Sequence, residues 1–377
     1  MTCYYCNDTL TSENESIEHI IPNAIGGRLK SKELLCKKCN SLLGEKYDSE
    51  LCNSLSTISG CLDIKRQKGE NPTIKNVRSE SGKKYNLIKG RHPEMASPIV
   101  DLDKDSNTVH ISARNEKELK DIIKGLKKKY PNLDDTDLEK KFVRQKYYMD
   151  EALTMTMQVG SKKFLKAIIK IAINYFLLQT GDRKAISQQI IDLQSDREIG
   201  VEIIRHYYAD ESVSYINAEE ITHSIYIKGD KKNKYLFAFV ELFSSYAFVV
   251  SLNTNYFGNE INFSYTYDVL TCLTVEKNIV INYTGKLDES DIELNKGFID
   301  TLTKKLNRVM EIGDKRQRNA IISELTNAAM KETIGKYPQG TKITQDMLAD
   351  FITKVSEDAV PFIAHLHKKQ NKRIPKK

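Results

Sequence analysis

The sequence predicts an α+β protein with a small N-terminal domain, a connector and a larger C-terminal domain. The first observation behind this prediction is a cysteine-rich stretch of about fifty residues, too short to bury a stable core without a staple. The second is a series of apolar segments between residues 223 and 283, separated by turn residues, which indicates antiparallel strands followed by helices. We place the three domains at residues 1–57, 58–136 and 137–377.

Four cysteines near the N-terminus form two pairs, and two residues separate the members of each pair. The pairs are Cys3 with Cys6 and Cys36 with Cys39. Four thiolates at this spacing match a closed tetrahedral zinc site, which would staple the small domain. The cysteines outside this set are Cys52, Cys61 and Cys272. Unpaired thiols and the lack of a secretory leader predict a cytoplasmic location.

Further motifs lie between and after the two cysteine pairs. They are Glu18-His19-Ile20-Ile21-Pro22, Gly26-Gly27 and Asn40, which directly follows the last cysteine. Together with the cysteines they resemble the zinc-containing branch of the HNH (ββα-metal) endonucleases, whose sequences read roughly C-x-x-C, E-H-I-x-P, G-G and C-x-x-C-N. The resemblance covers residues 1 to about 52. It implies a zinc-stapled ββα-metal nuclease domain, in which two strands and a helix surround the site.

The resemblance also implies a role for each polar residue of this stretch. His19 corresponds to the general base, and Glu18 and Asn40 to ligands of a catalytic Mg²⁺ or Mn²⁺ ion. One position departs from the family pattern, because Ser31 stands where an asparagine usually sits five residues before the third cysteine. The group that orients the His19 ring is therefore open, and Asn23 and a backbone carbonyl of the loop are both candidates.

These residues suit phosphodiester hydrolysis on chemical grounds as well. The reaction needs a proton acceptor for water and a cation for the charge that develops on the leaving oxygen. The His19 imidazole can accept a proton near neutral pH, and the oxygens of Glu18 and Asn40 suit Mg²⁺ or Mn²⁺. Neighbouring side chains of a strand point to opposite faces, so Glu18 and His19 can meet on one phosphate only if the strand ends or bends. Pro22 and Gly26-Gly27 favour such a bend.

Each assignment also has a structural alternative. His19 is compatible with a histidine beside the zinc site or in the core, and Asn40 with a cap of the helix that follows the last cysteine. Asp48, at the end of that helix, is compatible with a supporting role at the site, a cap or a surface position.

A strongly basic stretch follows the small domain. Residues 63–91 contain nine lysines and arginines but only three acidic residues. Five of the basic residues are candidate contacts to the DNA backbone: Lys65, Arg66, Lys68, Lys83 and Lys84. Such contacts supply affinity without reading sequence, although a solvated loop would have the same composition. The net charge of +7 for the whole chain also favours a polyanionic partner.

The connector and the core of the large domain show clear periodic patterns. We expect short strands at 97–101 and 108–113, and a helix that begins at Asn115 and stops at Pro131. In the large domain, an apolar face from Phe164 to Leu177 predicts a core helix that ends near Gly181. Its interior lysines, Lys166 and Lys170, can reach water along the side of the helix. They also make this run unsuited to cross a bilayer, and no membrane span is predicted.

The rest of the large domain reads as a sheet followed by helices. An antiparallel meander is predicted at 223–228, 235–243 and 246–252. Further strands are expected near 262–267 and 278–283. Additional helices are predicted at 183–193, 291–312, 315–332 and 344–360.

The function that the resemblance implies is metal-dependent cleavage of DNA. By analogy, the attached large domain suggests a bacterial defence or restriction-type effector whose cutting this domain controls. Two alternatives stay open: a zinc-stabilised nucleic-acid-binding protein that does not cleave, and a nuclease that is silent until a ligand or protein partner binds the large domain. The large domain carries no nucleotide-binding fingerprint, and self-association is an equally open role for it.

Overall fold

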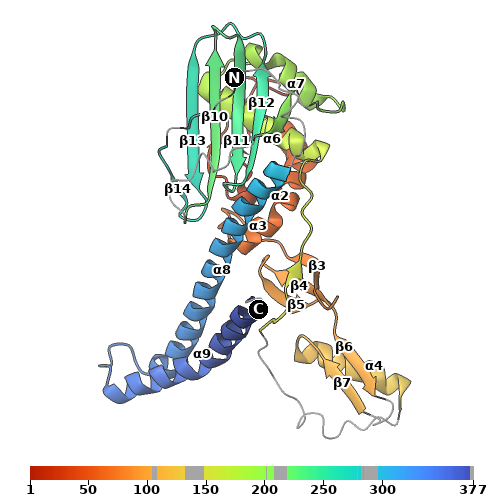
Figure 1. Ribbon diagram of the computed structural model, residues 1–377, viewed down its shortest axis with the longest axis vertical. Helices are drawn as coiled ribbons and strands as arrows, with labels where there is room; N and C mark the ends of the chain where they lie inside the picture. The colour runs from red at the N-terminus through yellow and green to blue at the C-terminus, as the bar shows by residue number, and fades with distance from the viewer. Residues whose placement is uncertain are drawn as a thin grey trace. The chain divides into compact units, whose positions relative to one another are not determined.

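The computed structural model describes residues 1–103, 108–131, 148–200, 202–207, 219–277, 279–281, 283 and 296–373. The chain forms two compact units (Figure 1). The first comprises Met1–Pro72 and Thr156–Arg316, and the second Thr73–Met155 and Gln317–Lys377. The predicted α+β class, with a small N-terminal part and a larger antiparallel domain followed by helices, is confirmed. The domain boundaries after residues 57 and 136 stay predictions, and the second of them lies outside the described residues.

The first unit begins with a short hairpin and a run of helices. Strand β1 (Glu18–His19) pairs antiparallel with β2 (Lys30–Ser31), and the turn η1 (Asn23–Ile25) lies between them. The helices that follow are α1 (Lys37–Leu43), the π-helical turn η2 (Gly44–Asp48), α2 (Ser49–Ser54) and α3 (Ser56–Cys61). The tight hairpin depends on Gly27, because a Cβ there would lie 1.8 Å from the backbone oxygen of Ile21.

The same unit contains a six-stranded sheet in which all neighbours are antiparallel. Its order is β14-β13-β10-β11-β12-β9. The strands are β9 (Ile204–His206), β10 (Thr222–Asp230), β11 (Tyr235–Leu242), β12 (Tyr246–Asn253), β13 (Ile261–Asp268) and β14 (Leu273–Thr274). The predicted meander is thus confirmed, and β13 returns to pair with β10.

The strand predicted at 278–283 is wrong for the residues that the structure describes there. Residues 279–281 and 283 lie outside any strand. Ile279 and Ile281 are buried instead against an aromatic face of the sheet that includes Phe237 and Phe239. The alternation of this segment therefore reflects packing across the sheet rather than pairing at its edge.

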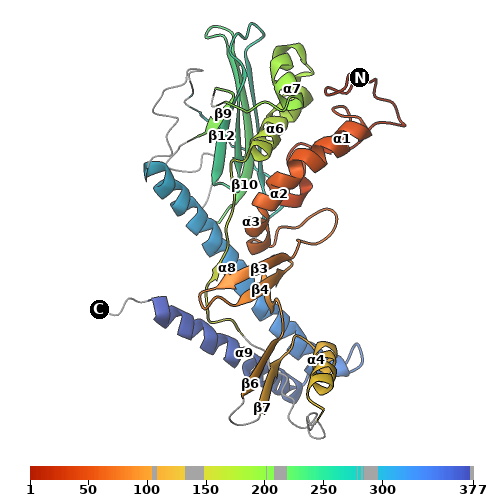
Figure 2. The ribbon, with the colours of Figure 1, turned by 90° about the vertical axis from the view of Figure 1, so that its right-hand side faces the viewer.

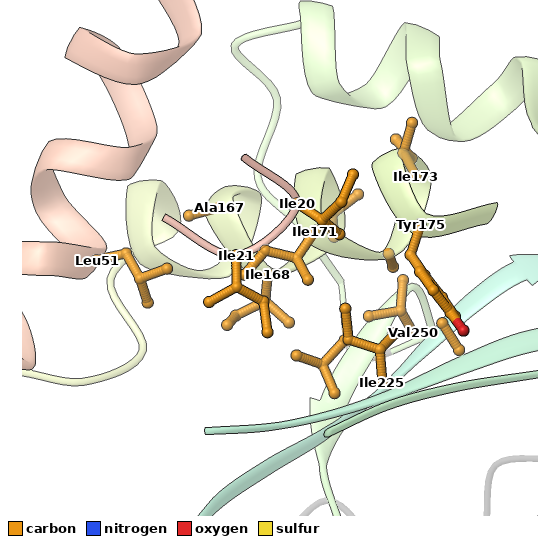
Figure 3. Packing of buried hydrophobic residues seen from close by; sticks show 14 of the residues in the cluster. Ile20, Ile21, Leu51, Ala167, Ile168, Ile171, Ile173, Tyr175, Ile225 and Val250 are labelled. Atoms are coloured by element: carbon orange, nitrogen blue, oxygen red, sulfur yellow. The ribbon is translucent and has the colours of Figure 1, made fainter. Parts of the chain in front are cut away.

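Helix α6 (Lys162–Thr180) packs between the sheet and the N-terminal helices (Figure 2). The 3₁₀ turn η3 (Lys184–Ile186) and helix α7 (Ser187–Gln194) follow it. One hydrophobic cluster joins all three parts of the unit. In Figure 3, Ile20 and Ile21 from the N-terminal domain meet Ile168 of α6, with Ile225 and Val250 of the sheet beneath. The N-terminal domain and the sheet therefore share a core.

The prediction that the two interior lysines of α6 reach water is wrong. Lys166 and Lys170 are each 1% exposed. The Lys166 ammonium donates to the backbone oxygens of Asp192 and Ser195 near the end of α7, where carbonyl groups lack helical partners. Lys170 is paired with carboxylates of the N-terminal domain, so both charges find their partners inside the protein.

The two helices predicted at 291–312 and 315–332 form a single helix, α8 (Lys296–Thr333). The break expected at residues 313–314 is absent, and Gly313 lies in a close contact instead. A Cβ on Gly313 would lie 2.3 Å from Sγ of Cys61, at the end of α3. The turn η5 (Ile334–Lys336) and helix α9 (Gln345–Arg373) follow, and α9 continues through Pro361 beyond its predicted end at residue 360.

The second unit contains the basic connector and the C-terminal helices. Its four-stranded sheet has the order β5-β4-β3-β8, made of β3 (Ile74–Ser79), β4 (Lys84–Ile88), β5 (His92–Met95) and β8 (Leu153–Thr154). The predicted strand pair and helix are present as β6 (Ile99–Asp103), β7 (Thr108–Ser112) and α4 (Glu116–Lys129). Asn115 caps α4 by accepting from the Glu118 amide. In the described part of the chain, no helix has the length and apolarity needed to span a membrane.

Candidate zinc and nuclease site

The four cysteines predicted to bind zinc lie together. The sulfurs of Cys3, Cys6, Cys36 and Cys39 are all within 4.8 Å of one another. Those of Cys6 and Cys36 are 3.8 Å apart, which is about the edge of a tetrahedron whose Zn–S bonds measure about 2.3 Å. The donor set and its spacing therefore fit a structural metal such as zinc.

The backbone around Cys3 favours its thiolate, whereas the surroundings of Cys39 do not. Burial raises the pKa of Cys3, but hydrogen bonds from the backbone of Cys36, Cys6 and Tyr5 outweigh it and lower this pKa overall. Cys39 has the opposite balance, since burial and the neighbouring thiols raise its pKa strongly. Four clustered sulfurs thus need a cation to hold all of them as thiolates.

The dipeptide Glu18-His19 forms the whole of β1, so the strand ends at His19, which is the condition under which the two side chains can meet on one phosphate. Glu18 is 3% exposed, whereas His19 is half-buried. Ser31 lies directly opposite Glu18 in the hairpin, and its hydroxyl accepts from the backbone amide of Glu33. Ser31 is therefore engaged within its own turn.

The His19 ring is held by Gln67, a residue that sequence reasoning did not single out. Nε2 of His19 lies 3.1 Å from Oε1 of Gln67. The backbone amide of Gln67 in turn donates to Oδ1 of Asn23 at 2.9 Å. Asn23 is therefore linked to the ring through Gln67. With Oε1 as acceptor, Nε2 carries the hydrogen and Nδ1 keeps a lone pair.

Asn40 lies inside α1, where Cys36 is the N-cap residue, so Asn40 does not cap this helix. Its amide nitrogen donates to the hydroxyl of Ser16 at 3.1 Å and to the backbone oxygen of Ile17 at 3.2 Å. These bonds tie Asn40 to the residue that precedes Glu18. Because the nitrogen is used in this way, the carbonyl oxygen is the atom that can ligate a cation.

Glu18 belongs to a buried charge cluster that α6 completes. The Lys170 ammonium lies 2.6 Å from Oε1 of Glu18 and 2.6 Å from Oδ2 of Asp48. The amide nitrogen of Asn174, one turn further along α6, donates to the same Oε1 at 2.7 Å. The Asp48 side chain makes no capping hydrogen bond at the start of α2 and is paired with Lys170 instead.

The cluster holds one negative charge in excess, since two carboxylates share one ammonium. Burial raises the pKa of Glu18, and the attraction of Lys170 offsets this only in part. The pKa of Lys170 is raised, because the two carboxylates outweigh the effect of its burial. Three buried polar atoms around the cluster have no partner within the described residues: Tyr4 Oη, Asp48 Oδ1 and Asn174 Oδ1. Excess charge and unpartnered oxygens fit a nearby cation.

The basic residues predicted to contact DNA divide between the two units. Lys65, Arg66 and Lys68 belong to the first, where Lys65 and Lys68 are exposed and Arg66 donates to the backbone oxygen of Glu70. Lys83 and Lys84 are exposed on the β3–β4 hairpin of the second unit. The five residues are therefore two separate groups.

Two of the residues that sequence reasoning missed carried a readable signal. Lys170 and Asn174 are four residues apart in the apolar middle part of the helix, so they share one face, and buried polar side chains at that spacing need a partner. Gln67 gave no such signal, because it lies in a basic stretch without periodicity.

The comparisons with known proteins agree with this geometry. Residues 3–56 match the family model described as HNH endonuclease. The match spans both cysteine pairs, β1, β2 and α1. No curated protein matches the chain. No solved structure matches it either.

Proposed function

We propose that this chain, whose residues 3–56 form an HNH endonuclease domain, is a metal-dependent endonuclease that hydrolyses the phosphodiester bonds of DNA. The family match supports nuclease chemistry in general. The observation that carries the finer proposal is the placement of three side chains within the matched residues. His19 and Glu18 form β1, and Asn40 is hydrogen-bonded to the residue before them.

His19 is the proposed general base. Its Nδ1 takes a proton from water while the water oxygen attacks phosphorus, and the bond from phosphorus to the leaving oxygen breaks. Gln67 keeps Nε2 as the donor nitrogen throughout, so that Nδ1 is the acceptor. Being half-buried, His19 can be reached by a phosphate group.

Glu18 and Asn40 are the proposed ligands of a divalent cation, Mg²⁺ or Mn²⁺. A bound cation of this kind stabilises the negative charge on the leaving oxygen and orients the phosphate. Two protein ligands suffice, because these ions retain water and take phosphate oxygens. The zinc at the four cysteines has the separate task of holding the hairpin and α1 together.

The test is incubation of zinc-loaded protein with supercoiled plasmid in the presence of Mg²⁺ or Mn²⁺. We expect nicked and linear products with either ion, none with EDTA, and cleavage slower by roughly 10²–10⁴-fold for His19→Ala. A matched RNA substrate tests the preference for DNA. Binding of DNA without cleavage under every condition would instead support the non-cleaving alternative. Cleavage that resists EDTA would overturn the metal dependence.

We further propose that the protein acts as a defence or restriction-type effector in the cytoplasm, and that the large domain controls when it cuts. The shared core supports this control, because a change in the sheet can reach the residues next to His19. An extract of phage-infected cells supplies candidate ligands or partners. Stimulation of wild-type protein but not of His19→Ala is the expected result, and equal rates with infected and uninfected extracts would contradict it.

A further inference from the structure

Two side chains of α6 reach the nuclease domain and meet at one atom of Glu18. Lys170 and Asn174 belong to the large domain by sequence, yet both contact Oε1 of the carboxylate that precedes the proposed base. A single oxygen held by an ammonium and an amide donor cannot also serve a cation well. The other oxygen, Oε2, takes neither contact.

We propose that Lys170 and Asn174 are positioning residues of the nuclease, which hold Oε1 of Glu18 so that Oε2 is the oxygen offered to the divalent cation. This inference rests on the proposed function. A metal ligand is commonly fixed by a second group bound to its other atom, and loss of that group weakens metal binding. Here the second group comes from a helix more than a hundred residues away in sequence.

A blocking role for Lys170, in which its ammonium takes the place of the cation, explains the arrangement less well. A blocking ammonium would not need Asn174, which holds the same oxygen without charge. It would also need a way to withdraw. Lys170 is 1% exposed on a helix packed between the sheet and α2, so its backbone is fixed on both sides. The geometry is that of a permanent support.

The supporting pair is itself held in place. Asp48 binds the Lys170 ammonium at 2.6 Å and so fixes it from the side of η2. Lys170 thus bridges two carboxylates of the nuclease domain, and its removal alone would leave both buried without a counter-charge. A single Lys170 variant would therefore mix two effects, a lost support and added negative charge that attracts a cation.

Two variants avoid this mixture. Asn174→Leu removes one support from Oε1 without any change of charge. The double variant Lys170→Met/Asp48→Asn removes the ammonium and one carboxylate together, so the excess negative charge of the cluster is unchanged. Matched controls come from the same core. Gln189→Leu replaces another buried amide, which donates to the backbone oxygen of Ser251, and Lys166→Met replaces the other buried lysine of α6.

The measurement is a titration of zinc-loaded, full-length protein with Mn²⁺, in which electron paramagnetic resonance reports bound Mn²⁺ and gives its Kd. The Glu18→Ala variant identifies which bound Mn²⁺ is relevant, because the resonance signal of the Mn²⁺ at Glu18 is the one that this variant should lack. We expect Asn174→Leu and the double variant each to weaken Mn²⁺ binding by about 10–100-fold, with cleavage recovering at high Mn²⁺. The two controls should keep the wild-type Kd, whatever their effect on thermal stability.

An unchanged or tighter Kd in both test variants would overturn the inference, and a tighter one in the double variant alone would point to a blocking lysine. If one test variant does not fold, as judged by zinc content and circular dichroism, the other decides. Wild-type protein that binds Mn²⁺ through Glu18 without cutting DNA would defeat the proposed function and leave this inference standing. Absence of Glu18-dependent Mn²⁺ binding in the wild type would defeat both.

Discussion

His223 of β10 holds the loop that follows the proposed catalytic dipeptide. Its Nε2 lies 2.8 Å from the backbone oxygen of Ile25, and its Nδ1 accepts from the backbone amide of Phe243 at 3.1 Å. These partners require the neutral tautomer with hydrogen on Nε2. The central strand of the sheet and the nuclease loop are thus joined by a histidine that must stay uncharged.

We predict that this histidine makes stability depend on pH. Burial lowers the pKa of His223 to about 4, from 6.5 in the unfolded chain. As pH falls, the unfolded state therefore binds a proton at this histidine before the folded state does. The free energy of unfolding is highest above pH 6.5 and decreases between pH 6.5 and pH 4, by roughly 3 kcal/mol for this group. Urea unfolding at several pH values should show the loss. His223→Gln, which keeps a donor and an acceptor but does not titrate, should show a flatter profile, and identical profiles would contradict the assignment.

Variants of the base and of the metal ligands should fail in different ways. His19→Ala should reduce cleavage by roughly 10²–10⁴-fold while Mn²⁺ binding stays intact, because the cation ligands remain. Glu18→Ala and Asn40→Ala should also lose cleavage, but through weaker metal binding, so that raised Mn²⁺ restores part of it. Cleavage rates over a Mn²⁺ series separate the two classes. Zinc content should be unchanged in all three, and zinc loss from His19→Ala would remove His19 from the role of base.

Loss of the Gln67 side chain should lower the rate of cleavage without weakening Mn²⁺ binding. Gln67→Ala frees the His19 ring to turn and to change tautomer, so kcat should fall by about 10-fold or more at an unchanged Mn²⁺ Kd. Asn23→Ala, which loosens only the backbone of Gln67, should have a smaller effect of the same kind. Gln188→Ala serves as the control, since its side chain contacts Asp192. A wild-type rate for Gln67→Ala would show that another group orients the ring.

Loss of the zinc site should destabilise more than the N-terminal domain. Cys36→Ser removes one of four sulfur ligands, and stoichiometric zinc should be lost. Because Ile20 and Ile21 pack in the same cluster as α6 and the sheet, thermal unfolding of the sheet should shift down together with that of the hairpin. Metal analysis and calorimetry measure both effects. Cys272→Ser, outside the set, should keep its zinc, and full zinc retention in Cys36→Ser would falsify the ligand assignment.

The five candidate DNA contacts lie in two different units of the structure, so each group should be tested separately. Neutralising Lys65, Arg66 and Lys68 together, or Lys83 and Lys84 together, should weaken DNA binding and flatten its dependence on salt by about one unit of slope per lost phosphate contact. Binding titrations over a salt series give the slope for each group. Neutralising Lys231 and Lys232, exposed in the β10–β11 turn, is the matched control. If neutralising one group changes the salt dependence of DNA binding no more than the control does, that group makes no phosphate contacts and belongs to a solvated loop.

The sequence predicted well wherever a local pattern has one physical solution. The two cysteine pairs were predicted to lie together and do so, and the apolar segments from β10 to β12, separated by turn residues, form the predicted sheet. The prediction went wrong where a residue serves a distant partner. Two helices were predicted with a break at residues 313–314, but they form one helix, in which the missing side chain of Gly313 makes room for Cys61. No pattern near Gly313 records that contact.

The candidate residues of the site can be named from the sequence, whereas the groups that contact them cannot. Glu18, His19 and Asn40 stand in a motif, so their spacing carries information. His19 contacts Gln67, and Glu18 contacts Lys170 and Asn174, and each of these three partners comes from a part of the chain whose position only the fold determines. The interior lysines of α6 were expected to reach water because an isolated helix offers them no alternative, whereas the folded core offers carboxylates and carbonyls.

The contacts of α6 with the nuclease domain affect when, during synthesis of the chain, the nuclease can become active. A ribosome releases the residues of the zinc site and of β1 well before it has synthesised Lys170 and Asn174. If these two residues support Glu18 as proposed, a nascent or prematurely terminated chain would carry the reactive histidine but only a weak hold on its cation. Cutting would begin only once α6 has been translated and has docked. The order of residues along the gene would then delay the nuclease until the domain proposed to restrain it is being built.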